Sequence, residues 1–367
     1  MPPRRGLGRH ELLVELERLA RDAGPAERRA SSGTRSVRVQ PRIWVLLGHR
    51  RGDNNQLLAL AHALGLPFET RSIDYNSLRR LPKRILGRTL VSVLPSSRRS
   101  FCPPWPDLVL GIGHRSVPVA RYIRHASGGW TKIVQLGNPR LDSKHFDLVI
   151  TMPQYGLRSS QRVLKLPLAM ASPHAEETPT DEERRFLAAL PRPHRLMVIG
   201  GPNRHWRVDE QDAANAARTL MERSERDGGT VIAIGSPRTK PSVERAIVEK
   251  IGKSRHRFVT DNMPRYLCLL EDADEIYVTA DSVSMLSEAI FTGKPVGMIP
   301  IRPVLRGIVS HTLADWGLAR SPKPNLRELW ASLKTAGLVG SIESPRAGDG
   351  QNPVQLAVDS VRALLDD

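Results

Sequence analysis

The residues most able to do chemistry lie in the segment 278–296. An apolar stretch ends at Ala280, short polar side chains follow, and Gly293 ends the helix that they open. The first turn of a helix carries unpaired N–H groups and the positive end of the helix dipole, and both attract phosphate. We therefore predict a phosphate site here, with Glu288 farther along the helix and within reach of an attached ribose. The other polar residues of this predicted site are Asp281, Ser282 and Ser284. An ordinary capped helix is the alternative interpretation.

Two loops in the same half of the chain carry glycines, hydroxyls and cations. Residues 200–205 and residues 235–240 each follow a predicted strand, so we expect both loops at the same edge of one sheet. Glycine lets the backbone approach a ligand closely, and arginine can bind two phosphate oxygens at once. Together these loops could hold a diphosphate without a metal ion, although each loop alone is also typical of a turn with solvated cations. The predicted phosphate-binding residues are Gly201, Asn203, Arg204, Ser236, Arg238 and Thr239.

The first half of the chain offers two candidates for a general base. Asp53 could face the substrate as a base, or it could cap the helix that it precedes. His114, which follows another predicted strand, is the alternative base, although a lone histidine is more often structural. Asn138 and Arg140 come after a third predicted strand. They could orient an acceptor, or they could belong to a turn set by an Asn-Pro pair.

The sequence indicates neither a metal centre nor a disulfide. Cys102 and Cys268 are far apart and have no His or Cys neighbours at metal-ligand spacing. Residues 272–274 have the Asp-x-Asp spacing of a metal-dependent sugar-nucleotide motif, but they precede a predicted strand, and we interpret them as a turn. We expect no metal and no bound cofactor. The cysteine usage also fits a reducing, cytoplasmic compartment.

Alternating strands and helices form the framework that must position these residues. The predicted strands of the first half are 43–47, 68–73, 108–112, 132–136 and 148–151, and those of the second half are 195–199, 230–234, 257–259, 276–279 and 296–299. Continuous apolar strands that alternate with helices are typical of parallel sheets covered on both faces. The sequence therefore predicts an α/β protein of two Rossmann-like domains that face a cleft, with ligands beyond the carboxyl ends of the strands.

The chain of 367 residues is long enough for two domains. A polar, proline-punctuated stretch near residues 171–179 separates the two halves. We predict a basic, largely disordered extension over residues 1–42. An N-terminal α/β domain over 43–170 and a C-terminal α/β domain over 180–345 follow it, and residues 346–367 are expected to form a tail and a helix.

Part of the net charge of +17 lies in residues 75–106, where seven basic side chains alternate with apolar ones. A basic amphipathic insertion of this kind can lie on an anionic membrane surface with its apolar side among the headgroups. The alternative is a solvated basic helix that packs on its own domain. Aromatic residues are too sparse in this stretch for base stacking, so we expect no nucleic-acid partner. No apolar run approaches the roughly 18 residues needed to cross a bilayer. We therefore expect a cytoplasmic protein that attaches peripherally to the inner face of a membrane.

Several motifs together resemble those of the bacterial and plant family named for mitochondrial fission. They are Gly52-Asp53-Asn54-Asn55-Gln56, Gly113-His114-Arg115, Gln135-Leu136-Gly137-Asn138-Pro139-Arg140, Gly200-Gly201-Pro202, Gly235-Ser236-Pro237-Arg238-Thr239, and Thr279-Ala280-Asp281-Ser282-Val283-Ser284-Met285 with Glu288-Ala289 and Gly293-Lys294-Pro295. The resemblance covers about residues 43–300. The chain departs from the family pattern at Pro237, where a second arginine is expected, and in the extension over residues 1–42.

The second half also resembles the donor-binding half of two-domain (GT-B) glycosyltransferases. This resemblance implies that Glu288 holds a nucleotide ribose, that the second half binds a nucleotide-sugar donor and that the first half binds the acceptor. The leading hypothesis is a metal-independent glycosyltransferase whose substrate is a nucleotide sugar, with Asp53 or His114 as the base. A non-catalytic, membrane-associated adaptor, which the role of the plant members implies, and a sugar-nucleotide epimerase are the alternatives.

Overall fold

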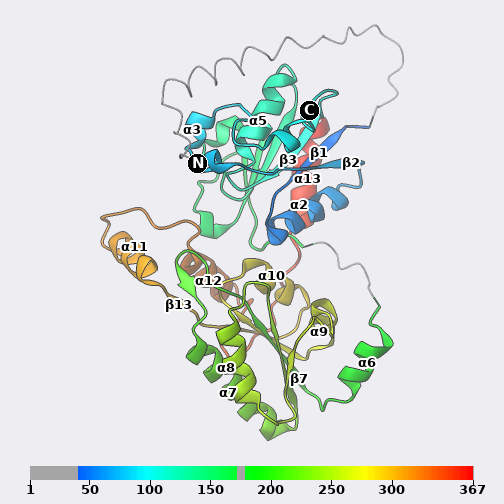
Figure 1. The fold of residues 1–367 in the computed structure, drawn as a ribbon, viewed down its shortest axis with the longest axis vertical. Coiled ribbons are helices and arrows are strands. Elements are labelled where there is room, and N and C mark those ends of the chain that lie inside the picture. The colour runs from blue at the N-terminus through cyan, green and yellow to red at the C-terminus, as the bar shows by residue number, and fades with distance from the viewer. Residues whose placement is uncertain (1–39, 172–177, 367) are drawn as a thin grey trace, which may run out of the picture. The chain divides into compact units, whose positions relative to one another are not determined.

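The computed structural model describes residues 40–171 and 178–366 of the chain. These residues form two compact α/β units, drawn as ribbons in Figure 1. Unit 1 contains the described residues up to Thr151, residues 157–166 and the C-terminal segment from Val354, and unit 2 contains residues 152–156 and 167–353. The predicted basic extension lies almost wholly outside the described residues.

A six-stranded parallel sheet in the order β2-β1-β3-β4-β5-β6 forms the centre of unit 1. Its strands are β1 (Ile43–Leu47), β2 (Phe68–Ser72), β3 (Leu108–Ile112), β4 (Lys132–Leu136), β5 (Leu148–Thr151) and β6 (Val163–Lys165), and its main helices are α2 (Arg51–Ala63), α5 (Val117–Ala126) and α13 (Val354–Asp366). The central strands are buried on both faces, which explains their continuous apolar sequences. The C-terminal helix α13 packs beside α2, and Arg362 donates a hydrogen bond to the carbonyl of Leu64 at 3.1 Å (Figure 1).

The basic insertion at residues 75–106 does not form a single amphipathic helix. It folds into the short helices η1 (Ser77–Arg80), α3 (Lys83–Leu86) and α4 (Pro95–Arg98). Prolines introduce α3 and α4, so the apolar residues cannot align on one continuous face. Leu86, Val91 and Val93 are buried in unit 1, whereas Ile85 and Leu94 are exposed, so only part of the apolar side packs on its own domain. The predicted contact of this stretch with a membrane stays a prediction. Within the stretches 40–171 and 178–366, no helix has the length and apolar character needed to span a bilayer.

A five-stranded parallel sheet in the order β10-β9-β7-β11-β12 forms the centre of unit 2. Its strands are β7 (His194–Ile199), β9 (Thr230–Gly235), β10 (Arg257–Val259), β11 (Glu275–Thr279) and β12 (Val296–Ile299). Its helices are α6 (Asp181–Ala188), α7 (Glu210–Asp227), α8 (Pro241–Ile251), α9 (Tyr266–Asp272), α10 (Val283–Phe291), α11 (Leu305–Asp315) and α12 (Leu326–Thr335). A small antiparallel ribbon of β8 (Trp206–Arg207) and β13 (Arg302–Pro303) precedes α11.

Each sheet reverses its strand order beside its first strand. In unit 1, β2 and β3 lie on opposite sides of β1, and in unit 2, β9 and β11 lie on opposite sides of β7. Loops that leave the strands at such a reversal diverge and open a space beyond the carboxyl ends, where ligands of open α/β sheets bind. The fold therefore puts the loops after β1 and β3, and those after β7 and β11, at ligand-binding edges of their own units.

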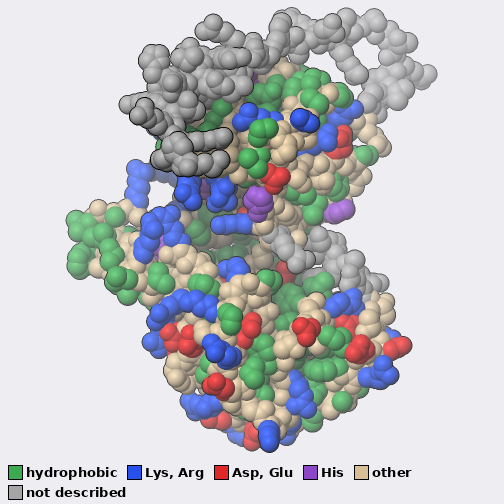
Figure 2. All heavy atoms as spheres, in the orientation of Figure 1, with side chains coloured by type: hydrophobic (Ala, Val, Ile, Leu, Met, Phe, Trp, Pro, Cys, Tyr) green, Lys and Arg blue, Asp and Glu red, His purple; other side chains and the backbone are tan. Residues whose placement is uncertain are grey.

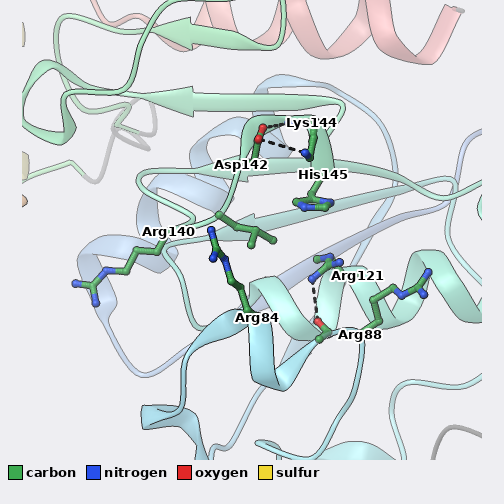
Figure 3. A pocket seen from close by; sticks show the side chains of 9 residues that line it. Arg84, Arg88, Arg121, Arg140, Asp142, Lys144 and His145 are labelled. Carbon is green, nitrogen blue, oxygen red and sulfur yellow. Dashed lines mark hydrogen bonds and ion pairs between the residues drawn. The ribbon is translucent and has the colours of Figure 1, made fainter.

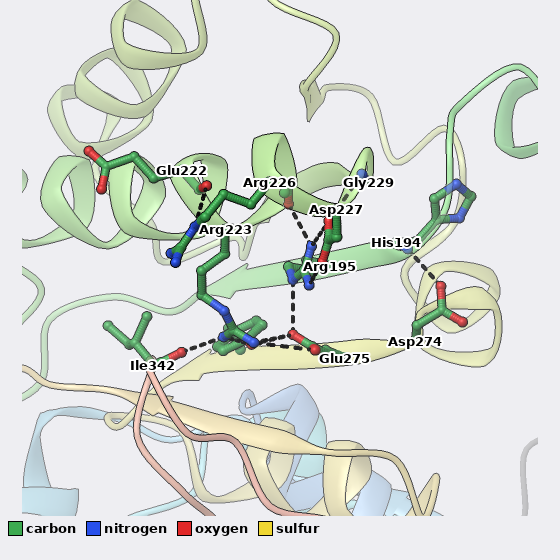
Figure 4. A network of polar contacts seen from close by, with 12 residues as sticks. His194, Arg195, Glu222, Arg223, Arg226, Asp227, Gly229, Asp274, Glu275 and Ile342 are labelled. Atoms are coloured by element: carbon green, nitrogen blue, oxygen red, sulfur yellow. Dashed lines mark hydrogen bonds and ion pairs between the residues drawn. The ribbon is translucent and has the colours of Figure 1, made fainter.

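A buried arginine connects the amino end of the unit 2 sheet to α7 (Figure 4). Arg195 on β7 is only 3% exposed, and its guanidinium contacts Glu275 on β11 and Asp227 on α7, each at 3.0 Å. Arg223 lies 3.2 Å from the same Glu275 carboxylate. Hydrogen bonds from Arg195 lower the pKa of Asp227. The carboxylates neutralise the buried charge of Arg195, and the network links strands β7 and β11 to helix α7.

Replacement of Arg195 should destabilise unit 2 strongly. Arg195→Met removes the cation and leaves the half-buried carboxylate of Glu275 and the exposed carboxylate of Asp227 without it, so we expect a loss of about 2 kcal/mol in the free energy of unfolding, measured by urea denaturation. The matched control is Arg218→Met, because Arg218 forms an exposed pair with Glu222 and its loss should cost less than about 0.5 kcal/mol. Equal losses in the two variants would contradict the structural role of Arg195.

Candidate functional site

A buried carboxylate joins three loops at the carboxyl edge of the unit 2 sheet. Asp281, after β11, accepts hydrogen bonds from the Thr279 hydroxyl at 2.7 Å and from the Gly201 N–H at 3.0 Å. Arg238, after β9, forms an ion pair with the same carboxylate at 2.9 Å. The structure thus brings together the three loops that the sequence places at one edge of the sheet.

Two glycines make this close approach possible. A Cβ atom on Gly200 would collide with the Asp281 carboxylate, and a Cβ atom on Gly201 would collide with the backbone of Arg238. The Thr239 hydroxyl lies 2.9 Å from the carbonyl oxygen of Gly200, which further joins the loop after β9 to the loop after β7. These glycines therefore allow the loops to pack against each other, whether or not a ligand contacts them.

The surroundings of Asp281 define its part in the site. Its side chain is fully buried, and burial raises its pKa, whereas its hydrogen bonds with Thr279 and Gly201 and the charge of Arg238 oppose that rise. Because the carboxylate oxygens already hold the Gly201 N–H and Arg238, Asp281 positions these donors. The predicted direct contact between Asp281 and phosphate stays a prediction.

Helix α10 carries the remaining residues of the predicted nucleotide site. Ser282 is its N-cap and accepts a hydrogen bond from the Met285 N–H at 3.5 Å, as the capped-helix interpretation describes. Ser284 is half-buried in the first turn. Glu288 is also half-buried and accepts a hydrogen bond from the Tyr266 hydroxyl of α9 at 3.0 Å.

Burial raises the pKa of Glu288, and only the hydrogen bond from Tyr266 opposes that rise. Among the described residues, no lysine or arginine pairs with this carboxylate. A carboxylate has room for about four hydrogen bonds, so Glu288 keeps unused acceptor positions in a half-buried place. Such a group is suited to the hydroxyl donors of a ribose.

The other predicted phosphate residues differ in how free their side chains are. Asn203 accepts hydrogen bonds from two N–H groups of its own turn, each at 3.0 Å, so its side chain shapes the loop. The Ser236 hydroxyl lies 3.1 Å from that of Thr239 and shapes the next loop in the same way. Arg204 is exposed, and in the part of the chain that the structure describes no carboxylate pairs with it. Arg204 is therefore free to meet an anion.

The carboxyl edge of the unit 1 sheet is strongly positive. The basic residues whose charges reach His114 are Arg50, Lys83, Arg115 and Arg140. Burial and then these charges lower the pKa of His114 to about 4, so its imidazole is neutral at pH 7. Its Nδ1 atom is buried and has no hydrogen-bond partner among the described residues.

Asp53 does not cap its helix, which corrects one of the two interpretations of this residue. Helix α2 begins two residues earlier, with Arg50 at the N-cap position. The side chain of Asn54 accepts a hydrogen bond from the Gly48 N–H at 3.0 Å and donates one to the Gly48 carbonyl at 2.8 Å. This contact closes the turn after β1, so the helix starts within the arginine-containing loop and Asp53 lies in its first turn.

The electrostatics of unit 1 act in opposite directions on the two candidate bases. Burial raises the pKa of Asp53, while the charges of Arg50 and Arg115 oppose the rise. The pKa of His114 moves the other way, down to about 4. A general base works best when its pKa lies near the pH of the reaction. The roles of Asp53 and His114 as bases stay predictions.

Asn138 and Arg140 form a tight turn after β4. The Asn138 Oδ1 atom accepts the Arg140 N–H at 2.9 Å, and Arg140 has a φ of 54°, in the left-handed region. Asn138 therefore belongs to a turn, which is the second of the two interpretations that its sequence allows. The side chain of Arg140 is exposed. Burial, followed by the charges of Arg115 and Arg140, lowers the pKa of Lys83 to about 8.

Sequence reasoning missed three residues of these two edges. Arg115 stands next to His114 in a motif that the sequence displays, so the cation could have been found by its position. Lys83 belongs to the insertion, and Tyr266 is 22 residues from its partner Glu288, so no local pattern marks either. The described residues contain no group of three or more His, Cys, Asp or Glu side chains that could hold a metal ion.

Comparison with known proteins identifies the family. The model of the family described as mitochondrial fission ELM1 matches residues 51–330. The chain belongs to this family. An uncharacterized protein of Rickettsia prowazekii is 23% identical over 301 residues, which cover 69% of this chain and 82% of that protein. The mitochondrial fission protein ELM1 of Arabidopsis thaliana is 25% identical over 244 residues, which cover 59% of this chain and 56% of that protein.

Solved structures show the fold class of this ELM1-family chain. S. aureus MnaA, solved with UDP, matches with a TM-score of 0.51 and 12% identity over 89% of this chain and 97% of its own. The UDP-GlcNAc 2-epimerase of Methanocaldococcus jannaschii matches with a TM-score of 0.51 and 13% identity over 89% of this chain and 100% of its own. The predicted α/β fold of two Rossmann-like, GT-B-like units is thereby confirmed.

We expect His114 to stay neutral throughout the physiological pH range. An NMR titration should give its imidazole a pKa of about 4, with the signal assigned by its loss in His114→Gln. Because the unfolded chain takes up this proton nearer pH 6.5, His114 should also cost the protein stability as the pH falls from 6.5 toward 4. The variant Arg140→Gln removes a positive neighbour and should raise the pKa of His114.

The control for this titration is Arg158→Gln, an exposed position in unit 1 whose charge does not contribute to the His114 shift. It should leave the His114 titration unchanged. A measured pKa of 6.5 or higher in the wild-type protein would show that the positive cluster does not act on this imidazole.

Proposed function

We propose that this protein binds a nucleotide sugar at the carboxyl edge of the unit 2 sheet and transfers the sugar to an acceptor without a metal ion. The observation that carries the proposal is the state of Glu288. Its carboxylate is half-buried, its pKa is raised by burial, and one tyrosine hydroxyl is its partner. Burial of a carboxylate without a charged partner costs stability. The hydroxyl groups of a ribose would donate hydrogen bonds to the acceptor positions of Glu288 that the protein leaves unused.

The neighbouring loops suit the diphosphate that such a reaction releases. The N-terminus of α10 offers backbone N–H groups, Arg204 is free, and Arg238 reaches the edge with its side chain 48% exposed. Cations and amides that are already in place stabilise a leaving group as its charge develops, and this can lower a barrier by several kcal/mol. In the same proposal Asp53 is the base that takes the proton from the acceptor hydroxyl.

A sugar-nucleotide epimerase is the alternative enzyme. It is favoured by the names of the proteins that share the fold, since MnaA was solved with UDP and another neighbour is a UDP-GlcNAc 2-epimerase. Both enzymes would bind the same class of nucleotide. The products separate them, because a transferase attaches the sugar to an acceptor and an epimerase returns an isomer of its own substrate.

A membrane-associated role is a second candidate, and helix α11 is the observation that favours it. Figure 2 shows apolar side chains gathered over this helix. They are Leu305, Ile308, Val309, Leu313 and Trp316, with Leu305 77% and Trp316 71% exposed. Their spacing puts them on one helix face, while Gly307 and His311 on the other side are buried against the β8 segment.

The charges around α11 suit an anionic bilayer. Arg306 and Arg320 are exposed on and beyond the helix, and the acidic Asp315 pairs with Arg327. An apolar face with a tryptophan at one end and arginines beside it is typical of helices that lie in the interface of a membrane. In this proposal α11, rather than the insertion at 75–106, provides the apolar contact with lipid.

Substitution of Glu288 tests nucleotide binding. In calorimetric titrations with uridine, guanosine and adenosine diphosphates, the wild type should bind at least one nucleotide, and Glu288→Gln should bind it about 10–100-fold more weakly, the effect of a lost charge-assisted hydrogen bond. Thermal stability without ligand should change little. The matched control Glu249→Gln alters an exposed carboxylate on α8 and should bind like the wild type. If the wild type binds none of the nucleotides, the adaptor hypothesis replaces the enzyme.

Sedimentation with vesicles tests the role of α11. We expect the protein to sediment with phosphatidylcholine vesicles that contain phosphatidylglycerol, and Ile308→Glu with Val309→Glu should abolish this, since two charges would enter the apolar face. The control Val248→Glu with Leu356→Glu places the same charges at other exposed apolar positions, 47% and 55% exposed, and should keep binding. Equal loss in both double variants would mean that general charge, not α11, governs attachment.

A further inference from the structure

Unit 1 contains a concave site with an unusual excess of positive charge (Figure 3). The cavity has a volume of about 400 Å³. The charged residues that line it are Arg84, Arg88, Arg121, Arg140, Lys144 and Asp142. They come from α3 and the residue segment after it, from α5 and from the loop after β4, which Figure 3 shows around the same space. Three separate parts of the chain therefore contribute cations to one cavity.

The single carboxylate of the cavity does not neutralise these cations. Asp142 lies 3.5 Å from the ammonium of Lys144, and the charge and N–H of that lysine help to lower the pKa of Asp142. Within residues 40–171 and 178–366, no acidic side chain forms an ion pair with any of the four arginines. Arg121 instead donates a hydrogen bond to the carbonyl of Gly87 at 3.2 Å.

The protein holds these cations together at a cost. Burial and the charge of Arg88 lower the pKa of Arg121, and burial with the charges of Arg121 and Lys144 lowers the pKa of the lining His145. Mutual repulsion of this kind is unfavourable in the empty protein. An anion that enters the cavity would reduce the repulsion among these cations. The arrangement therefore favours the binding of an anion.

We propose that this cavity binds a phosphomonoester, a dianionic phosphate on a small organic group. Arginine guanidinium groups match phosphate geometry with paired hydrogen bonds, and the several unpaired arginines around the cavity match a double negative charge better than a single carboxylate would. The volume falls in the range of roughly 300–1,000 Å³ that is usual for small-molecule sites, which leaves room for the organic part of the ester. The site lies entirely in unit 1 and does not rest on nucleotide binding in unit 2.

The same phosphate chemistry could reach the cavity from two sources, a soluble ester or a lipid headgroup. We would titrate the full chain with glycerol 3-phosphate and with inorganic phosphate by calorimetry, and measure sedimentation with phosphatidylcholine vesicles that contain phosphatidic acid. The test variant is Arg84→Gln with Arg88→Gln, because both side chains are exposed and neither forms an ion pair in the described chain. The control is Arg99→Gln with Arg158→Gln, which removes two exposed charges from unit 1 outside the cavity.

We expect saturable binding by the wild type, a loss of at least tenfold in the test variant and wild-type binding in the control. Binding of glycerol 3-phosphate assigns a soluble ligand, whereas binding of phosphatidic acid vesicles alone, with the same pattern of variants, assigns a lipid headgroup. Absence of both kinds of binding in the wild type would overturn the proposal. An equal loss in the test and control variants would also overturn it, since general charge would then explain the attraction. The outcome is separable from nucleotide binding because Glu288→Gln should leave the phosphomonoester titration unchanged.

Discussion

The unit 2 site depends on the cost of burying the carboxylate of Asp281. A buried charge is tolerated only when hydrogen bonds and an opposite charge surround it, and here those partners come from three loops, as Thr279, the Gly201 N–H and Arg238. Meeting this need fixes the spacing of the loops. That spacing in turn leaves no room for a Cβ atom at positions 200 and 201. The shape of the edge therefore follows from one electrostatic requirement. Among the described residues, Glu288 has a tyrosine hydroxyl as its one hydrogen-bond partner, so its surroundings differ from those of Asp281. This difference is what the proposed nucleotide contact of Glu288 rests on.

The two units treat positive charge in opposite ways. In unit 2 the buried Arg195 is matched by Glu275 and Asp227, so its charge strengthens the fold. In unit 1 the buried Lys83 donates to the carbonyl of Arg79 at 3.2 Å and has no carboxylate partner among the described residues, and its pKa falls to about 8. Repulsion among cations lowers stability, and in unit 1 Lys83 and Arg121 donate hydrogen bonds to backbone carbonyls, those of Arg79 and Gly87, and, within the described chain, not to carboxylates. The proposed binding of an anion in the cavity would relieve this repulsion.

The sequence allowed the framework to be predicted because buried parallel strands are apolar throughout. Strands β1 and β12 have the predicted bounds. The reversals beside β1 and β7 could not be predicted, because they depend on the order of strands in the sheet, which the sequence pattern does not contain. The ribbon of β8 and β13 has only two residues in each strand and leaves no period to detect. The insertion at 75–106 shows most clearly what a sequence pattern cannot predict. Apolar side chains that pack in a core and apolar side chains that face lipid are of the same residue types. In the candidate site of unit 2, the sequence predicted which loops take part. It did not predict the partner of Glu288, because Tyr266 lies on a different helix.

The positive edge of unit 1 bears on how an acceptor could be activated. Cations near a hydroxyl favour its deprotonated form, and they disfavour a protonated imidazole in the same place. Burial and, after it, the charges of four basic neighbours lower the pKa of the His114 imidazole. In such a field an acceptor hydroxyl loses its proton more easily, so the base that receives the proton can be weak. Burial raises the pKa of Asp53, and the charges of Arg50 and Arg115 oppose that rise. A carboxylate within a positive edge is the arrangement that the proposed transfer to an acceptor hydroxyl would use.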